Sequence, residues 1–133
     1  MRMSASALIG AGSLISDNRG VGIRVWDGST LNLGINATVE DNLSHGVLVS
    51  GNSVVIPLQA IIRRNQGNGI HLRDTSLAGS WVGEEPTITD NTGWGVYCEG
   101  FPGDARLQSP GYDLSAVFGN AVGQIDCPGY QIP

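Results

Sequence analysis

Six side chains that could bind a polar ligand recur at two fixed positions after a repeated asparagine. Aromatic faces beside guanidinium and carboxylate groups suit a sugar ring, because the ring stacks its apolar face and forms hydrogen bonds at its edge. A structural interpretation stays open, in which Arg73 and Glu99 form an exposed ion pair worth under about 1 kcal/mol and His71 is a solvated surface residue. The six residues are Arg24, Trp26, His71, Arg73, Tyr97 and Glu99.

The residue types and spacings do not complete a catalytic or metal-binding set. A Ser-His-Asp triad cannot be placed, because His45 is expected in a turn, away from the position that carries His71. Neither cysteine, Cys98 or Cys127, belongs to a CxxC motif or has a histidine partner, so neither zinc nor redox chemistry is indicated. We therefore assign no catalytic residue and expect no metal or cofactor.

Aspartates precede several of the repeated asparagines and raise the question of a cation site. Asp17 and Asp41 would stand on neighbouring repeats without a positive partner, whereas Arg64 falls between Asp41 and Asp90 and would relieve their repulsion. Two carboxylates fall short of the roughly six to eight oxygens that Ca²⁺ takes. The aspartate pair therefore leaves the expectation of no bound metal unchanged.

The elements that must position these side chains are copies of one phrase. The phrase has an apolar residue, an asparagine three positions later, a glycine four positions after that, and then an alternating apolar run. Successive asparagines are 24, 23, 26 and 29 residues apart, and such a period is the mark of a solenoid. The last copy has its glycine one place early, at Gly123. The asparagines are Asn18, Asn42, Asn65, Asn91 and Asn120.

Each repeat contains three short strand-like segments separated by turns. In the first repeat, residues 22–27 alternate between apolar and polar, residues 31–35 alternate again after an Asp-Gly turn, and residues 38–41 lead into the next asparagine. No segment has the period and caps of a helix. We therefore predict one all-β solenoid domain over residues 1–133, of about five coils with three strands each. The repeats lie near 15–38, 39–61, 62–87, 88–116 and 117–133.

The repeated asparagine and glycine both have a physical explanation at a sharp corner. We expect the asparagine to adopt the left-handed backbone region, and its side-chain amide to hydrogen-bond to the equivalent amide about 4.8 Å away in the next coil. The glycine would let the chain re-enter a strand without a Cβ clash. Five copies share this register, which predicts a continuous asparagine ladder.

Two columns of residues should stack inside the coils. The column five positions after the asparagine contains Ile23, Val47, Ile70, Val96 and Ile125, and the column seven positions after it ends with Cys98 and Cys127. The coil spacing is compatible with a disulfide, but parallel Cβ vectors are less favourable, so a disulfide and a pair of stacked thiols both stay open. The positions between and after these columns should point outward, and they carry the six candidate ligand-binding residues.

Composition and charge exclude several classes of function. The net charge of −5, with only seven Lys and Arg, argues against a nucleic-acid partner, and no apolar run approaches the roughly 18 residues that span a bilayer. The apolar residues near the start lead directly into the first repeat, so we expect strands there and not a signal peptide. Two longer segments, 74–86 and 99–112, would form loops on one side.

These phrases resemble the repeats of right-handed parallel β-helix proteins, the pectate-lyase-like superfamily, over residues 15–127. The superfamily includes polysaccharide lyases, glycoside hydrolases, epimerases, phage tailspikes and surface proteins without known activity. The resemblance implies that a substrate would lie along an outward sheet face. It favours our leading interpretation, a non-catalytic extracellular module that is structural or contacts polysaccharide. The small polar surface residues and the acidity are also typical of a secreted protein.

A polysaccharide lyase or glycoside hydrolase is the first alternative. A lyase would use His71 or Arg73 as its base, and an inverting hydrolase would use Glu99 and Asp126, whose neighbouring coils could place the carboxylates about 6.5–9.5 Å apart. The NTD, DD, GHG and RIK signatures of the related polygalacturonases are absent as such. The sequence therefore favours a protein that is not an enzyme.

Open coil ends give the second alternative. No amphipathic cap helix is visible, and an uncapped coil exposes backbone donors and acceptors to another chain. Two explanations follow: the chain is an excised piece of a longer protein, or its coils associate with copies of itself. The second explanation predicts a self-assembling solenoid.

Overall fold

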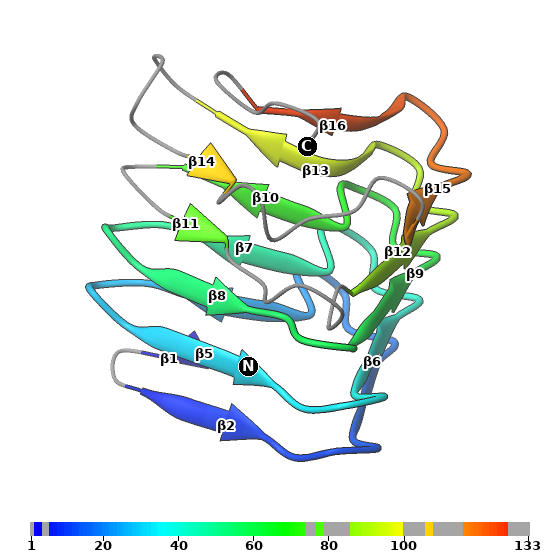
Figure 1. Ribbon diagram of the computed structural model, residues 1–133. Coiled ribbons are helices and arrows are strands. Elements are labelled where there is room, and N and C mark those ends of the chain that lie inside the picture. The colour runs from blue at the N-terminus through cyan, green and yellow to red at the C-terminus, as the bar shows by residue number, and fades with distance from the viewer. Residues whose placement is uncertain are drawn as a thin grey trace.

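The fold is an all-β parallel solenoid (Figure 1). The computed structural model describes residues 2–3, 6–73, 77–78, 86–99, 106–107 and 116–127. These residues contain no α-helix, and none of their segments is a helix long and apolar enough to cross a membrane. In the described part of the chain, five successive coils each contribute one strand to each of three parallel sheets, and a sixth strand follows in one of the sheets, which confirms the predicted architecture.

The three sheets, A, B and C, run the length of the solenoid. Sheet A contains β1 (Arg2–Met3), β4 (Ile23–Val25), β7 (Val47–Val49), β10 (Ile70–Leu72), β13 (Trp94–Cys98) and β16 (Gly123–Asp126). Sheet B contains β2 (Ala7–Ile9), β5 (Thr30–Leu33), β8 (Val54–Ile56), β11 (Leu77–Ala78) and β14 (Arg106–Leu107). Sheet C contains β3 (Leu14–Ser16), β6 (Thr38–Glu40), β9 (Ile61–Arg63), β12 (Thr87–Thr89) and β15 (Val117–Phe118).

The core consists of apolar columns that stack in the predicted register. In sheet A, Val47 pairs with Ile23 on one side and Ile70 on the other, and all three are fully buried. The apolar residues near the start form the predicted strands β2 and β3. The longer segments 74–86 and 99–112 lie mostly outside the described residues, which include only β11 and β14 from their middle parts.

The asparagine ladder is present and is almost completely buried. Asn42, Asn65 and Asn91 are at most 1% exposed. The Nδ2 group of Asn42 donates to the Oδ1 atom of Asn65 at 2.9 Å, and that of Asn65 donates to Asn91 at 3.0 Å. The backbone N–H of each asparagine donates to the same oxygen. The ladder therefore satisfies the polar groups of the corner inside the core.

The prediction that the asparagine itself adopts the left-handed conformation is wrong. The residue before the asparagine adopts it instead, with φ of 57° at Asp41, 52° at Arg64 and 57° at Asp90. That residue makes the sharp turn, and the turn directs the next side chain into the core. Aspartate tolerates this region better than most residues because its short side chain hydrogen-bonds locally.

The repeat glycines are required by close contact between coils. A Cβ atom at Gly46 would lie 2.8 Å from the Asn65 Nδ2 atom and 2.8 Å from the Gly69 carbonyl oxygen. Gly123 has a different role from the one expected, because it pairs with Trp94 and a side chain there would collide with the indole. The position four after Asn120 belongs to Gln124.

A disulfide joins the last two coils. The Sγ atoms of Cys98 and Cys127 are bonded, with the Cα atoms 4.7 Å apart, and the two residues are 29 positions apart in the chain. Both cysteines lie in the core column that also contains Val25, Val49 and Leu72. The bond therefore fixes the C-terminal coil to the coil beneath it.

Replacing Asn65 by alanine should destabilise the protein by about 2–4 kcal/mol, because it removes the acceptor for two buried donors of Asn42. Asn18→Ala is the matched control, since Asn18 is partly exposed and, within the described residues, donates to Asn42 alone. Urea unfolding of both variants measures the difference. Equal losses at the two positions would contradict a buried cooperative ladder.

Removing the disulfide with Cys98→Ala and Cys127→Ala together should cost roughly 3–4 kcal/mol, from the chain entropy of a loop of this length. Thermal unfolding of the wild type with and without reductant provides the same comparison without mutation. If the midpoint does not change in either experiment, the disulfide does not stabilise the terminal coil.

Candidate functional site

Three aromatic rings contact one another across successive coils on the outer side of sheet A: His45 stacks on His71, and Tyr97 is tilted against His71. The ring centroids of His45 and His71 are 4.3 Å apart with an interplanar angle of 26°, and those of His71 and Tyr97 are 5.2 Å apart at 40°. Strand pairing explains the second contact, because His71 in β10 lies directly opposite Tyr97 in β13. The expectation that His45 lies away from His71 is therefore wrong: the turn before β7 places its imidazole on the strand face.

The histidine cluster comprises His45, His71, Tyr97 and Glu99. Asn68 connects it across three coils. Its backbone N–H donates to the His45 Nδ1 atom at 2.9 Å, and its Nδ2 atom lies 2.9 Å from the His71 Nδ1 atom. Its Oδ1 atom accepts the backbone N–H of Trp94 at 2.7 Å, which identifies Nδ2 as the group that faces His71. Asn68 is 9% exposed, so a buried side chain supports the two imidazoles.

This network assigns the tautomers of both histidines. In each ring Nδ1 accepts a hydrogen bond from Asn68, so Nε2 carries the proton. The His71 Nε2–H group donates to the Glu99 Oε2 atom at 2.7 Å. Neither imidazole therefore presents a free lone pair to solvent, which a general base needs. The Glu99 carboxylate, which accepts the bond from His71, is exposed to solvent.

Burial determines the protonation of His45. Desolvation is the main cause that lowers the pKa of His45 from 6.5 to about 4, and the neighbouring His71 acts in the same direction. The glycine at position 67 permits this packing, since a Cβ atom there would lie 2.6 Å from the His45 Nδ1 atom. His45 is therefore neutral at pH 7 and acts as a hydrogen-bond acceptor and a flat apolar surface.

Glu99 is held as an anion. The hydrogen bond from His71 lowers the pKa of the Glu99 carboxyl, and the charge of Arg73 lowers it further. The pairing of Glu99 with His71 was not among the predictions, which paired this carboxylate with Arg73. The Glu99 side chain is 49% exposed, so it can also accept hydrogen bonds from a ligand.

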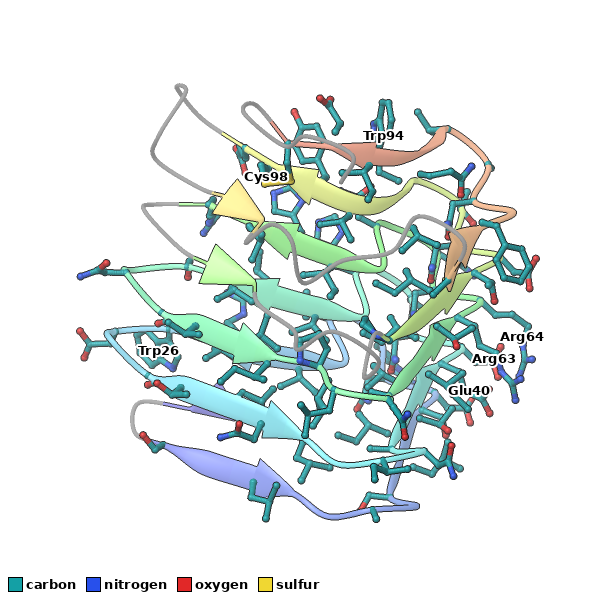
Figure 2. The ribbon with its side chains drawn as sticks, in the orientation of Figure 1. Trp26, Glu40, Arg63, Arg64, Trp94 and Cys98 are labelled. Carbon is teal, nitrogen blue, oxygen red and sulfur yellow. A yellow bond between two sulfur atoms is a disulfide. The ribbon has the colours of Figure 1, made fainter. Side chains whose placement is uncertain are left out.

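The structure separates the six predicted residues into two groups. His71, Tyr97, Glu99 and Arg73 belong to neighbouring coils, whereas Arg24 lies two coils away in the same column. Leu48 separates Arg24 from His71, and it is buried although its column was expected to be exposed. Trp26 is 43% exposed and lies far from Trp94, at another corner of the solenoid (Figure 2). Arg24 and Trp26 are therefore not part of the histidine cluster.

A second charged cluster lies on sheet C (Figure 2). Glu40 accepts hydrogen bonds from Arg63 at 2.7 Å and from Arg64 at 2.8 Å. Arg64 also binds both carboxylate oxygens of Asp41 at 3.0 Å, and this contact lowers the Asp41 pKa. Asp41 thus has a positive partner, contrary to the expected unrelieved pair with Asp17. The described residues contain no group of three or more side chains that could hold a metal ion.

The sequence carries a signal for the contact between His45 and His71. His45, Asn68 and Trp94 each stand three positions after a ladder asparagine, in three successive repeats. Such a column must stack in a solenoid, just as the strand columns do. The prediction that His45 lies apart from His71 assumes that polar turn residues are solvated, whereas these turn residues stack from coil to coil.

The stability of the protein should fall as the pH decreases from about 6.5 to about 4, because the unfolded chain binds a proton at His45 in this window and the folded chain does not. After discounting for partial solvent exposure, we expect a loss of about 1–2 kcal/mol. His45→Asn should flatten this dependence, since the asparagine Oδ1 atom can accept the N–H of Asn68.

Denaturant unfolding between pH 4 and pH 8 measures this dependence, and Glu99→Gln is the control that keeps His45. Glu99 has a lowered pKa in the folded state, so the stability that it contributes is fully present above its ordinary pKa of 4.5. This stability is lost only below that pH, as the pH falls through the folded-state pKa. An unchanged slope in His45→Asn would show that another group titrates in the window.

The sequence matches one protein family over most of its length. The family described as right handed beta helix region matches residues 1–108, which is most of the sequence. No curated protein and no solved structure matches it. The family match agrees with three parallel sheets, one strand per coil in each, and a buried asparagine ladder. The chain belongs to the family of right-handed β-helix proteins.

Proposed function

We propose that this β-helix is a carbohydrate-contacting module that binds its ligand on the outer face of sheet A, around Tyr97 and Glu99. The observation that supports this function is the stack of His45, His71 and Tyr97 with the Glu99 carboxylate at its edge. Tyr97, the last ring of this group, offers an apolar surface to the C–H face of a sugar, and a fixed carboxylate accepts bonds from its hydroxyl groups.

The packing of the cluster favours binding to a prepared surface. Asn68 hydrogen-bonds to both imidazoles, and the strand pairing between β10 and β13 places Tyr97 beside His71. A ligand would therefore lose little affinity to ordering of the protein side chains.

The charges favour a neutral glycan over an acidic one. The exposed acceptor of the cluster is the Glu99 anion, and the whole chain carries a net charge of −5. A uronate carboxylate at Glu99 would be repelled, whereas sugar hydroxyl groups can donate to it. Arg73 is the nearby group that an acidic glycan would use instead, so both classes need testing.

Two further features support a non-catalytic role outside the cytoplasm. Both imidazoles use Nδ1 to accept from Asn68, which leaves no histidine lone pair for proton abstraction. The disulfide between Cys98 and Cys127 is typical of oxidising compartments.

Tyr97→Ala should weaken glycan binding about tenfold or more, because it removes the ring that continues the stack. A panel of neutral and acidic polysaccharides, measured by calorimetry or affinity electrophoresis, identifies the ligand class. Phe118→Ala is the matched control, since Phe118 is an aromatic residue 55% exposed on sheet C. Equal binding by the wild type and Tyr97→Ala, or no binding to any glycan, would contradict the proposal.

A further inference from the structure

The asparagine ladder has a direction. Each rung donates its backbone N–H and its Nδ2 group to the Oδ1 atom of the rung that follows in the chain, from Asn18 to Asn42 and onward to Asn120. One end of the ladder must therefore present an acceptor, and the other end must present two donors. The two ends are chemically complementary.

The acceptor end is Asn18. Among the described residues, none donates a hydrogen bond to its Oδ1 atom, although the equivalent oxygen of Asn42 accepts two. Asn18 is also partly exposed, unlike the inner rungs. A coil placed on this end could donate to this oxygen as every inner coil does.

The donor end is occupied from within the chain. The Asn120 Nδ2 group donates to the Gln124 Oε1 atom at 2.9 Å, and the Asn120 backbone N–H donates to the same oxygen at 3.3 Å. The Gln124 Oε1 atom thus takes the place that the asparagine Oδ1 atom of a following coil would take. Gln124 is not a ladder residue, because it lies on the same coil as Asn120.

Gln124 stands at the position of the repeat glycine. In the four preceding repeats this position is Gly22, Gly46, Gly69 and Gly95. A Cβ atom at Gly69 would lie 2.6 Å from the carbonyl oxygen of Gly95 in the next coil, so a stacked coil tolerates only glycine beneath it. A glutamine at this position is incompatible with another coil of the same kind above it.

From these observations we propose that Gln124 is a stop residue: it blocks head-to-tail stacking of a second copy of this chain on the C-terminal coil. Without it, the Asn120 donors of one copy would face the Asn18 Oδ1 atom of the next copy. Such a head-to-tail contact does not close on itself and would continue into a filament. Gln124 satisfies the donors internally and fills the space, a device against edge-to-edge association.

The test compares the wild type with Gln124→Gly and Gln124→Glu. The glycine restores the repeat residue and frees the Asn120 donors, whereas the glutamate keeps both the bulk and an acceptor oxygen. Light scattering over a wide concentration range should give a constant monomer mass for the wild type and Gln124→Glu. The mass of Gln124→Gly should rise with concentration to dimers and larger species, and adding Asn18→Ala should reverse this rise.

Hydrogen exchange at the Asn120 backbone amide provides a readout that does not depend on association. At low concentration this amide should be protected in the wild type and should exchange about tenfold faster in Gln124→Gly. A folded Gln124→Gly that stays monomeric would overturn the proposal. A wild type that assembles end to end would overturn it too, as would an unprotected Asn120 amide in the wild type, even if Gln124→Gly fails to fold.

Discussion

The buried chain of amide hydrogen bonds is the interaction on which the rest of the fold depends. At each inner rung, one oxygen accepts two N–H groups, and the Nδ2 group has a second acceptor in a carbonyl of the coil below, as between Asn65 and Val39. A polar amide can be buried at this corner only because each of its groups has a partner. This requirement explains the glycine four positions later, the left-handed residue before the asparagine, and the constant register of the three sheets.

The same corner produces the candidate site. Because the ladder fixes where each turn begins, the residues three positions after the asparagines also stack, and His45, Asn68 and Trp94 share one column. Asn68 then links this turn column to the strand column that contains His71 and Tyr97. The site is therefore a by-product of solenoid regularity, modified at a few positions. In this site Asn68 hydrogen-bonds to the Nδ1 atoms of both imidazoles.

The C-terminal end differs from the inner coils in ways that fit one another. Gln124 replaces the repeat glycine, Gly123 makes room for Trp94, and the disulfide fixes Cys127 to the coil beneath. Among the described residues, the coil of Gln124 stacks on one neighbour, through β13 and β16, so it lacks half of the stacking contacts of an inner coil. An internal acceptor for Asn120 and a covalent bond both compensate for that loss, and both are local to the last repeat.

The sequence by itself determined the period, the three strands per coil, the core columns and the ladder, because each depends on a one-dimensional repeat that stacking must preserve. It did not determine which corner residue takes the left-handed conformation, because asparagine and aspartate both tolerate it. The tertiary structure decided that point, the contact of His45 with His71, the pairing of Glu99 with His71 and the role of Gln124. These features depend on how far a side chain reaches across a turn, and this distance is set by the packing of neighbouring coils. The bonding of Cys98 to Cys127 depended on packing in the same way, since the spacing in the chain was compatible with both bonded and free thiols.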